Sequence, residues 1–183
     1  VEIEGNDLRD LTVGGIRHLA LARHLRIAHN HLERVDHGAI MVLGPDDRPR
    51  SADEAIVEAN TLIECVRAPR VGVDHGITVN RARLARIDRN TLVRVGALES
   101  GHAGVEALYV IDTWLCDQVE VTANCLREIG PASPQPGVVQ IVAIHVVFTR
   151  EAALVADNRL TSDAPRQVQP LAFWQEANYI DSA

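Results

Sequence analysis

Apolar residues recur at helical spacing in two segments of the chain. From Thr12 to about Arg34 they approximate one face, and Ala, Leu and Arg supply helix propensity. A second segment begins at Ser51, a candidate N-cap that is followed by acidic residues, and Pro69 closes it. The apolar positions of the second segment are Ala55, Ile56, Ala59, Leu62, Ile63 and Val66. These patterns predict two helices.

Other segments have the composition of strands. Residues 39–43 and the almost entirely aliphatic run 138–149 are typical of buried strands. Residues 77–87 and 91–96 alternate partly between apolar and polar positions, with Asp88-Arg89-Asn90 between them. That arrangement predicts a hairpin whose turn uses Asn. Residues 34–44 also echo 86–96, since both have a basic residue, an aliphatic residue, Asp, a turn and a strand that ends in Gly. A decayed duplication is one explanation.

Residues 103–129 fit two interpretations. As a helix, they form one apolar stripe that ends before Gly130-Pro131. As strands, Val119, Val121, Ala123 and Cys125 alternate with polar residues, and the content of Val, Ile and Thr favours this choice. In either case we expect a single α+β domain over 1–183, with an N-terminal arm at 1–11 and a C-terminal tail at 163–183.

The tetrapeptide Val-Asp-His-Gly occurs twice, at 35–38 and at 73–76, each time before an apolar run. An acid beside an imidazole can transfer protons or bind a metal. The same letters also make an ordinary turn before a strand, because Asp bonds to its own backbone and Gly accepts a positive φ. Both interpretations stay open.

Composition excludes several functions. Aromatic residues make up 3% of the chain and the net charge is −7, which argues against a partner made of nucleic acid. The N-terminus is acidic and no run approaches 18 apolar residues, so no signal peptide or membrane span is expected. Three cysteines without a C-x-x-C pair fit a reduced, cytoplasmic protein. No Walker lysine or G-x-G-x-x-G pattern is present, so we expect no cofactor.

The strand interpretation leads to one family resemblance. Asp117-Gln118-Val119-Glu120-Val121, then Glu128-Ile129-Gly130, then 138–149 and 151–161 follow one another within about 105–162. This order resembles the sheet of hot-dog-fold acyl-thioester enzymes. The resemblance implies an antiparallel-rich sheet packed on one or two helices, with thioesterase or dehydratase activity. It also gives Asp74-His75-Gly76 and Asn80 the place of the family's catalytic loop, with His and Gly in inverted order, while Cys116 replaces a Gly of the family pattern.

The helix interpretation leads to another resemblance. A hairpin at 77–96, a helix at 103–129, a strand at 138–149, a helix at 150–160 and a strand at 166–174 are similar to the trimeric deaminase and chorismate-mutase-like domains. Their carboxylate-binding arginine has Arg166 as its counterpart, and their Ser-Gly strand is absent.

The leading hypothesis is an enzyme that acts on a small acyl-thioester or carboxylate metabolite by Asp/His acid–base chemistry, as a homo-oligomer. The candidate catalytic residues are Asp36, His37, Asp74 and His75, and the candidate substrate-binding residues are Asn80, His102, His145 and Arg166. One alternative is a non-catalytic oligomeric subunit or small-molecule-binding protein. Another alternative has two or more of His37, His75, His102 and His145 bind zinc or another divalent ion, although the leading hypothesis assigns no metal.

Overall fold

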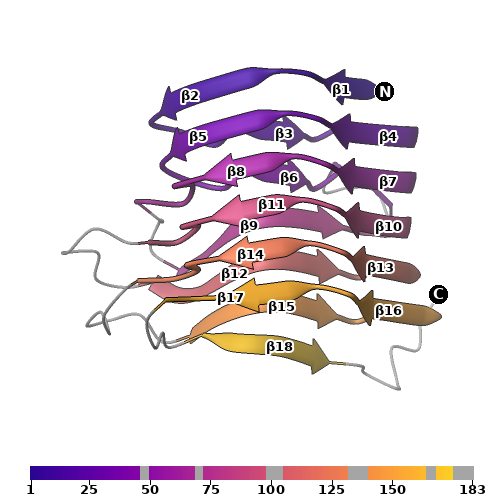
Figure 1. The fold of residues 1–183 in the computed structure, drawn as a ribbon. Helices are drawn as coiled ribbons and strands as arrows, with labels where there is room; N and C mark the ends of the chain where they lie inside the picture. The colour runs from indigo at the N-terminus through magenta and orange to yellow at the C-terminus, as the bar shows by residue number, and fades with distance from the viewer. Residues whose placement is uncertain (46–49, 69–71, 98–104, 132–139, 164–167, 175–183) are drawn as a thin grey trace.

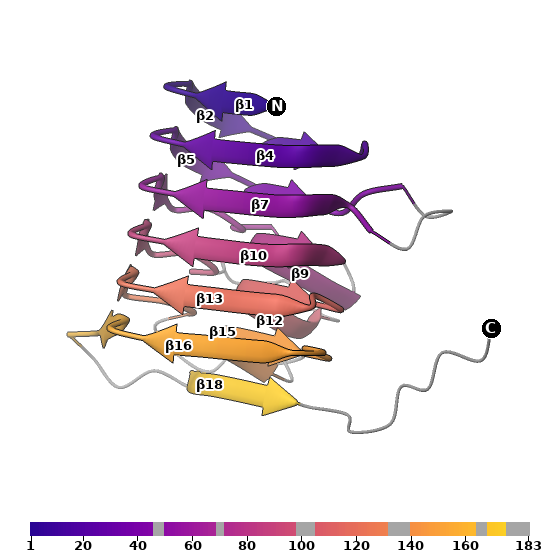
Figure 2. The same ribbon diagram turned by 90° about the vertical axis from the view of Figure 1, so that its right-hand side faces the viewer.

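The structure is a computed structural model, and it describes residues 1–183 except 46–49, 69–71, 98–104, 132–139, 164–167 and 175–183. Every regular element in this part of the chain is a β-strand, and the strands form three parallel six-stranded sheets. Figures 1 and 2 show the chain winding through the three sheets in turn, so that six coils stack along one axis. The fold is a parallel β-solenoid.

Each coil contributes one strand to each sheet, in chain order. The first sheet contains β1 (Glu2–Glu4), β4 (Ala22–Ala28), β7 (Ala52–Glu58), β10 (Ala82–Asp88), β13 (Gln118–Thr122) and β16 (Ala152–Ala156). The second contains β2 (Asp7–Leu11), β5 (His31–Val35), β8 (Thr61–Ile63), β11 (Thr91–Val93), β14 (Cys125–Arg127) and β17 (Arg159–Thr161). The third contains β3 (Ile16–His18), β6 (Ile40–Val42), β9 (Gly72–Asn80), β12 (Val105–Trp114), β15 (Gln140–Val147) and β18 (Gln169–Trp174).

The core consists of aliphatic rows that run along the solenoid axis. Because the strands pair in register, the same position of each coil lies above its counterpart in the next coil. A row in the second sheet contains Leu32, Leu62, Leu92 and Leu126, each at most 1% exposed. A row in the third sheet contains Ile40, Ile77, Ile111 and Ile144. Burial of such a side chain contributes about 1.5–3 kcal/mol.

Left-handed residues turn the chain at the corners between sheets. The corner between the first and second sheets uses positive φ at Gly5, His29, Ala59, Arg89, Ala123 and Asp157. The next corner does so at Asp10, Arg34, Glu64, Arg94 and Glu128. Most of these residues are not glycine, although L-residues pay roughly 1–2 kcal/mol for this conformation. Interactions between coils must therefore stabilise the corners.

A ladder of asparagines supplies that stabilisation at the first corner. The Asn ladder consists of Asn6, Asn30, Asn60, Asn90, Asn124 and Asn158. The backbone N–H of each of the first five members donates to the side-chain Oδ1 of the member in the next coil, over 2.9–3.0 Å. The side-chain amide also donates to a backbone carbonyl of the preceding coil, as Asn60 does to Ile27. Four members of the ladder are buried, at 0–1% exposure.

The structure corrects both predicted helices. Residues 12–34 contain β3, β4 and part of β5, and the segment from Ser51 contains β7 and β8. The error has a physical cause. Leu25 and Ile27 face the core with the two-residue period of a strand, and the left-handed corner at His29 then shifts the phase before Leu32. A two-residue period interrupted by corners imitates a helical stripe.

The hairpin at 77–96 is also wrong. β9, β10 and β11 belong to three different sheets and pair in parallel with other coils, and Asn90 is a member of the Asn ladder. The described part of 103–129 contains the strands β12, β13 and β14, as one interpretation had it. The strand predicted at 39–43 is confirmed by β6, and the described part of 138–149 contains β15. The similarity between 34–44 and 86–96 does not follow the repeat of the coils. Arg86 pairs in register with Ile56, and Ile56 pairs with Arg26, so the counterpart of Arg86 is Arg26 rather than Arg34.

The predicted α+β class and both family resemblances are therefore wrong. A hot-dog fold needs an antiparallel sheet around a helix, and the deaminase-like alternative needs helices packed on a sheet. The described residues contain no helix, and all their strand pairs are parallel.

Replacing a central member of the Asn ladder should destabilise the protein. Asn60→Ala leaves the Asn30 backbone N–H buried without its acceptor, for which we expect a loss of about 2 kcal/mol in the free energy of unfolding. Asn6→Ala is the matched control at the exposed end of the ladder, and it should cost less than half as much. Urea denaturation followed by circular dichroism measures both, and equal losses would contradict a stabilising role of burial in the ladder.

Candidate active site

The outer face of the third sheet carries a polar cluster because the alternation of side chains breaks in β12. Leu108, Val110 and Ile111 all belong to the core, so two consecutive residues face inward. The break leaves Tyr109 and Asp112 together on the outer face. The residues that pair with them in β9 and β15 lie beside them on the same face.

In-register pairing fixes which side chains meet on this face. The outer row, a line of stacked positions across the third sheet, contains Arg17, Met41, Thr78, Asp112, His145 and Ala172. Beside the outer row, His75 pairs with Tyr109. Neighbouring strands are about 4.8 Å apart, so residues more than 30 positions apart in the sequence become contacts.

Asp112 is the centre of the cluster. The residue is 4% exposed. The Nδ1 atom of His145 lies 2.8 Å from Oδ1, and the Thr78 hydroxyl lies 3.0 Å from Oδ2. The Nδ1 atom of His75 is 3.4 Å from the same Oδ2, without the geometry of a hydrogen bond. A buried carboxylate that accepts from His145 Nδ1–H leaves the Nε2 atom of that ring unprotonated when the ring is neutral.

Tyr109 lies against both imidazoles. Its ring stacks on His145 with centroids 3.9 Å apart and planes at 10°, and its centroid is 5.8 Å from that of His75. Burial lowers the pKa of His75 below the usual 6.5, while Asp112 and Asp74 oppose that shift. Burial likewise raises the pKa of Tyr109 above 10. At neutral pH the cluster therefore combines a neutral imidazole with a protonated phenol.

The backbones of β9 and β12 approach each other closely beside the cluster. A Cβ atom at Gly76 would lie 2.5 Å from the carbonyl oxygen of Val110, nearer than real Cβ atoms approach. Gly76 is the residue after His75 in the second Val-Asp-His-Gly copy, so the glycine of the motif is required where β9 meets the irregular part of β12.

A pocket of about 160 Å³ opens next to the cluster, on the same face. Its lining includes Arg17, His37, Met41 and Asp74. Asp74 is 5% exposed, and its Oδ2 atom has no hydrogen-bond donor among the described residues. The nearest imidazole nitrogen, Nδ1 of His37, is 3.7 Å away. The pocket thus offers a guanidinium at one side and an unpaired carboxylate oxygen at the other.

The structure brings together five of the residues that the sequence nominated. His37 meets Asp74, and His75 and His145 share Asp112. Asn80 is close to them, since its Oδ1 atom lies 3.1 Å from the Thr78 hydroxyl.

Three nominated residues stay outside this group. Asp36 forms an ion pair with Arg67 at 2.7 Å, so it acts as a structural partner in its turn. His102 and Arg166 lie outside the described residues.

Sequence reasoning missed Asp112, Tyr109, Thr78 and Arg17. None of them stands in a short motif, and only their spacing marks them. Thr78 precedes Asp112 by 34 positions, and Asp112 precedes His145 by 33. The asparagine spacings of 24, 30, 30, 34 and 34 would have revealed coils of similar length.

The cluster does not have the donor set of a metal site. Within the described ranges, no group of three or more His, Cys, Asp or Glu side chains is arranged to hold a metal ion. Asp112 bridges two imidazoles through their Nδ1 atoms, and an ion that binds between them would have to displace the His145 hydrogen bond. Proton transfer suits the arrangement better.

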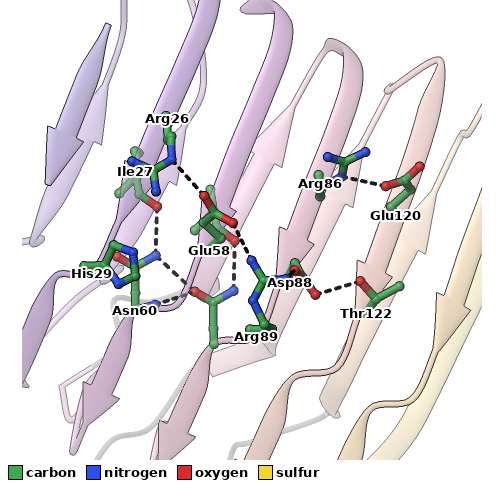
Figure 3. Close-up of polar contacts among 12 residues, drawn as sticks. Arg26, Ile27, His29, Glu58, Asn60, Arg86, Asp88, Arg89, Glu120 and Thr122 are labelled. Atoms are coloured by element: carbon green, nitrogen blue, oxygen red, sulfur yellow. Dashed lines mark hydrogen bonds and ion pairs between the residues drawn. The ribbon is translucent and has the colours of Figure 1, made fainter.

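The outer face of the first sheet is also highly charged, but its charges are paired with one another. Figure 3 shows Arg26 bonded to Glu58, and Arg86 bonded to Glu120. The N–O distances are 2.7 Å and 2.6 Å. Arg89 also reaches Glu58, at 2.8 Å. Since these arginines meet carboxylates of adjacent coils, this face offers few free charges to a ligand, unlike the pocket at Arg17.

No protein-family model, no curated protein and no solved structure matches this chain. The assignment of the site therefore depends on its own geometry. Separately, the described residues include no helix of the length and apolarity that a membrane crossing requires.

The lowered pKa of His75 predicts a pH dependence of stability. The unfolded chain takes up a proton at this residue near pH 6.5, before the folded chain does, so stability is full above about pH 6.5 and falls as pH drops through the lower folded-state pKa. His75→Gln should flatten the wild-type loss of urea midpoint between pH 7 and 5. His29→Gln, at an exposed ring, is the control and should keep the wild-type slope; an unchanged slope in His75→Gln would refute the assignment.

Proposed function

We propose that the outer face of the third sheet is an acid–base active site that transfers a proton on a small carboxylate-bearing substrate. One observation supports this above all: a buried carboxylate, Asp112, holds two imidazoles beside an open pocket that contains an arginine. This carboxylate contacts two imidazoles, and imidazole is the side chain that most often serves as a general acid or base.

Arg17 is the group that would bind the substrate carboxylate. Arg17 forms no ion pair with any of the described residues, and it lines the pocket. The Asp74 Oδ2 atom would accept a hydrogen bond from a hydroxyl or amine of the same substrate. From β3 to β9 is two strand spacings, or about 10 Å, which matches a small metabolite and places its far end at His75.

His75 would then be the proton acceptor. Its lowered pKa keeps the ring neutral at pH 7, it directly follows Asp74 of the pocket lining in the chain, and its Nδ1 atom lies 3.4 Å from Asp112. Tyr109, protonated at neutral pH, is the candidate proton donor. Asp112 and His145 are positioning residues: the carboxylate fixes the imidazole orientations, and the stacked His145 ring holds Tyr109 in place.

A reducing compartment such as the cytoplasm fits the thiols. Cys65, Cys116 and Cys125 are free, and burial raises the pKa of Cys65 and of Cys116 to about 12, which makes these two thiols inert.

Substitutions in the cluster should abolish proton exchange without unfolding the protein. In D2O, NMR would follow exchange of the α-hydrogens of pyruvate, malonate and 2-oxoglutarate as probes. We expect His75→Gln to slow the exchange that the protein catalyses by roughly 10²–10⁴-fold, the usual contribution of a general base. Arg17→Gln should raise KM with little change in kcat, because it removes binding rather than chemistry. His29→Gln is the matched histidine control.

The outcome separates catalysis from a structural role. If Asp112→Asn lowers the melting temperature while His75→Gln leaves exchange unchanged, the cluster only stabilises the third sheet. If none of the probes binds or exchanges, and a wider set of small carboxylates gives the same result, the proposed substrate class is wrong.

A further inference from the structure

The two ends of the solenoid expose the edge strands of all three sheets, one end with the first coil and the other end with the last coil. β1, β2 and β3 are the outermost strands at one end of the described sheets, and β16, β17 and β18 are outermost at the other (Figures 1 and 2). An edge strand presents backbone N–H and C=O groups that can pair with another strand. In a stacked-repeat protein, the end coils need a polar or covered outer face.

The end formed by β16–β18 is apolar. Leu160 and Leu171 continue two core rows, yet they are 39% and 45% exposed, whereas Leu92 and Ile111 in the same rows are fully buried. A depression of about 230 Å³ lies between them and is lined also by Leu126 and Val155. Uncovered core positions of this kind mark an interaction surface.

The opposite end carries the complementary members of the same rows. Ile3, Leu8 and Leu11 are only partly buried and pack on the core from one side, and Ile16 is 8% exposed. Continued register would stack Ile3 on Val155, Leu8 on Leu160 and Ile16 on Leu171. Each of these pairings joins two aliphatic side chains.

The Asn ladder has a direction, and its two ends match. Each backbone N–H donates to the Oδ1 atom of the next member, so the donor of Asn158 has no acceptor among the described residues. At the other end, the Asn6 Oδ1 atom accepts no hydrogen bond from the described residues. A second copy would place the acceptor of Asn6 at the donor of Asn158.

Charge is complementary in the same register. Along the second sheet, Asp7 pairs with His31 and Cys125 pairs with Arg159, so Asp7 and Arg159 occupy one position of their respective end coils. Both side chains belong to exposed residues. In-register continuation would bring the Asp7 carboxylate of one copy next to the Arg159 guanidinium of another.

We propose that copies of this chain associate head to tail, with β1–β3 of one copy pairing in parallel with β16–β18 of the next, in the register of the solenoid. The contact is heterologous, so it leaves a free end on each side and allows open-ended stacks. Apolar rows, the Asn ladder and one charge pair all continue across the joint, and the outer face of the third sheet stays open.

The first test is a charge exchange followed by sedimentation velocity over a concentration series. Arg159→Asp and Asp7→Arg should each weaken association roughly two- to five-fold, because each sets like charges together at the joint. An equimolar mixture of the two variants, or the double variant, should regain the wild-type constant. Arg83→Asp, at an exposed arginine of β10 in a central coil, is the matched control and should leave association unchanged.

The second test traps the register. Stacked Cα atoms lie about 4.8 Å apart, within the range that a disulfide spans. All the cysteine variants carry Cys125→Ser, because the native Cys125 thiol is stacked beside position 159 in the same copy. Under mild oxidation, Asp7→Cys mixed with Arg159→Cys should give an intermolecular cross-link, whereas Asp7→Cys mixed with Arg83→Cys should not. Circular dichroism confirms that each variant is folded.

Three results would overturn the proposal. The first is a monomer at every concentration with no Asp7–Arg159 cross-link, which would mean that something other than a second copy covers the apolar end. The second is association that neither charge variant changes. The third is cross-linking between two copies that both carry Arg159→Cys at the same yield as the mixture, which would indicate a symmetric contact.

Discussion

The structure depends on one constraint: each coil must lie in register on the preceding coil so that the corner N–H groups find their acceptors. The Asn ladder meets this requirement at the corner between the first and second sheets, where the asparagine backbone N–H groups donate to side-chain oxygens of the next coil. A slip of one residue would break the ladder and turn the Leu row of the second sheet away from the core. Hydrogen bonding and burial therefore select the same register.

That register also explains how a polar site forms on a repetitive scaffold. Coils of different length still align at each strand, so residues about 34 positions apart are placed side by side, as Asp112 is with Thr78 and His145. The break of alternation in β12 adds Tyr109 to the same face. The core rows are buried in the central coils that carry the site, and strands supported by a packed core give a proton-transfer site the rigid backbone that it requires.

The two proposals use different parts of the molecule. Association would extend the solenoid along its axis, through the ends of the core rows, while the candidate site lies on a lateral face that stacking leaves uncovered. In the stacked register, Arg17 of one copy would lie beside Ala172 of its neighbour, which continues the outer row across the joint. The site itself is complete within one copy.

Local sequence determined some elements without help from the fold. The aliphatic runs of β6 and β15 predict buried strands, because this property depends on neighbouring residues alone. The fold class and the centre of the site depended on tertiary structure. Left-handed corners shift the phase of a two-residue pattern until it imitates helices, and coils of unequal length hide the repeat. Asp112, Tyr109 and Arg17 become neighbours of the nominated histidines only through parallel pairing between coils, an interaction that no short segment encodes.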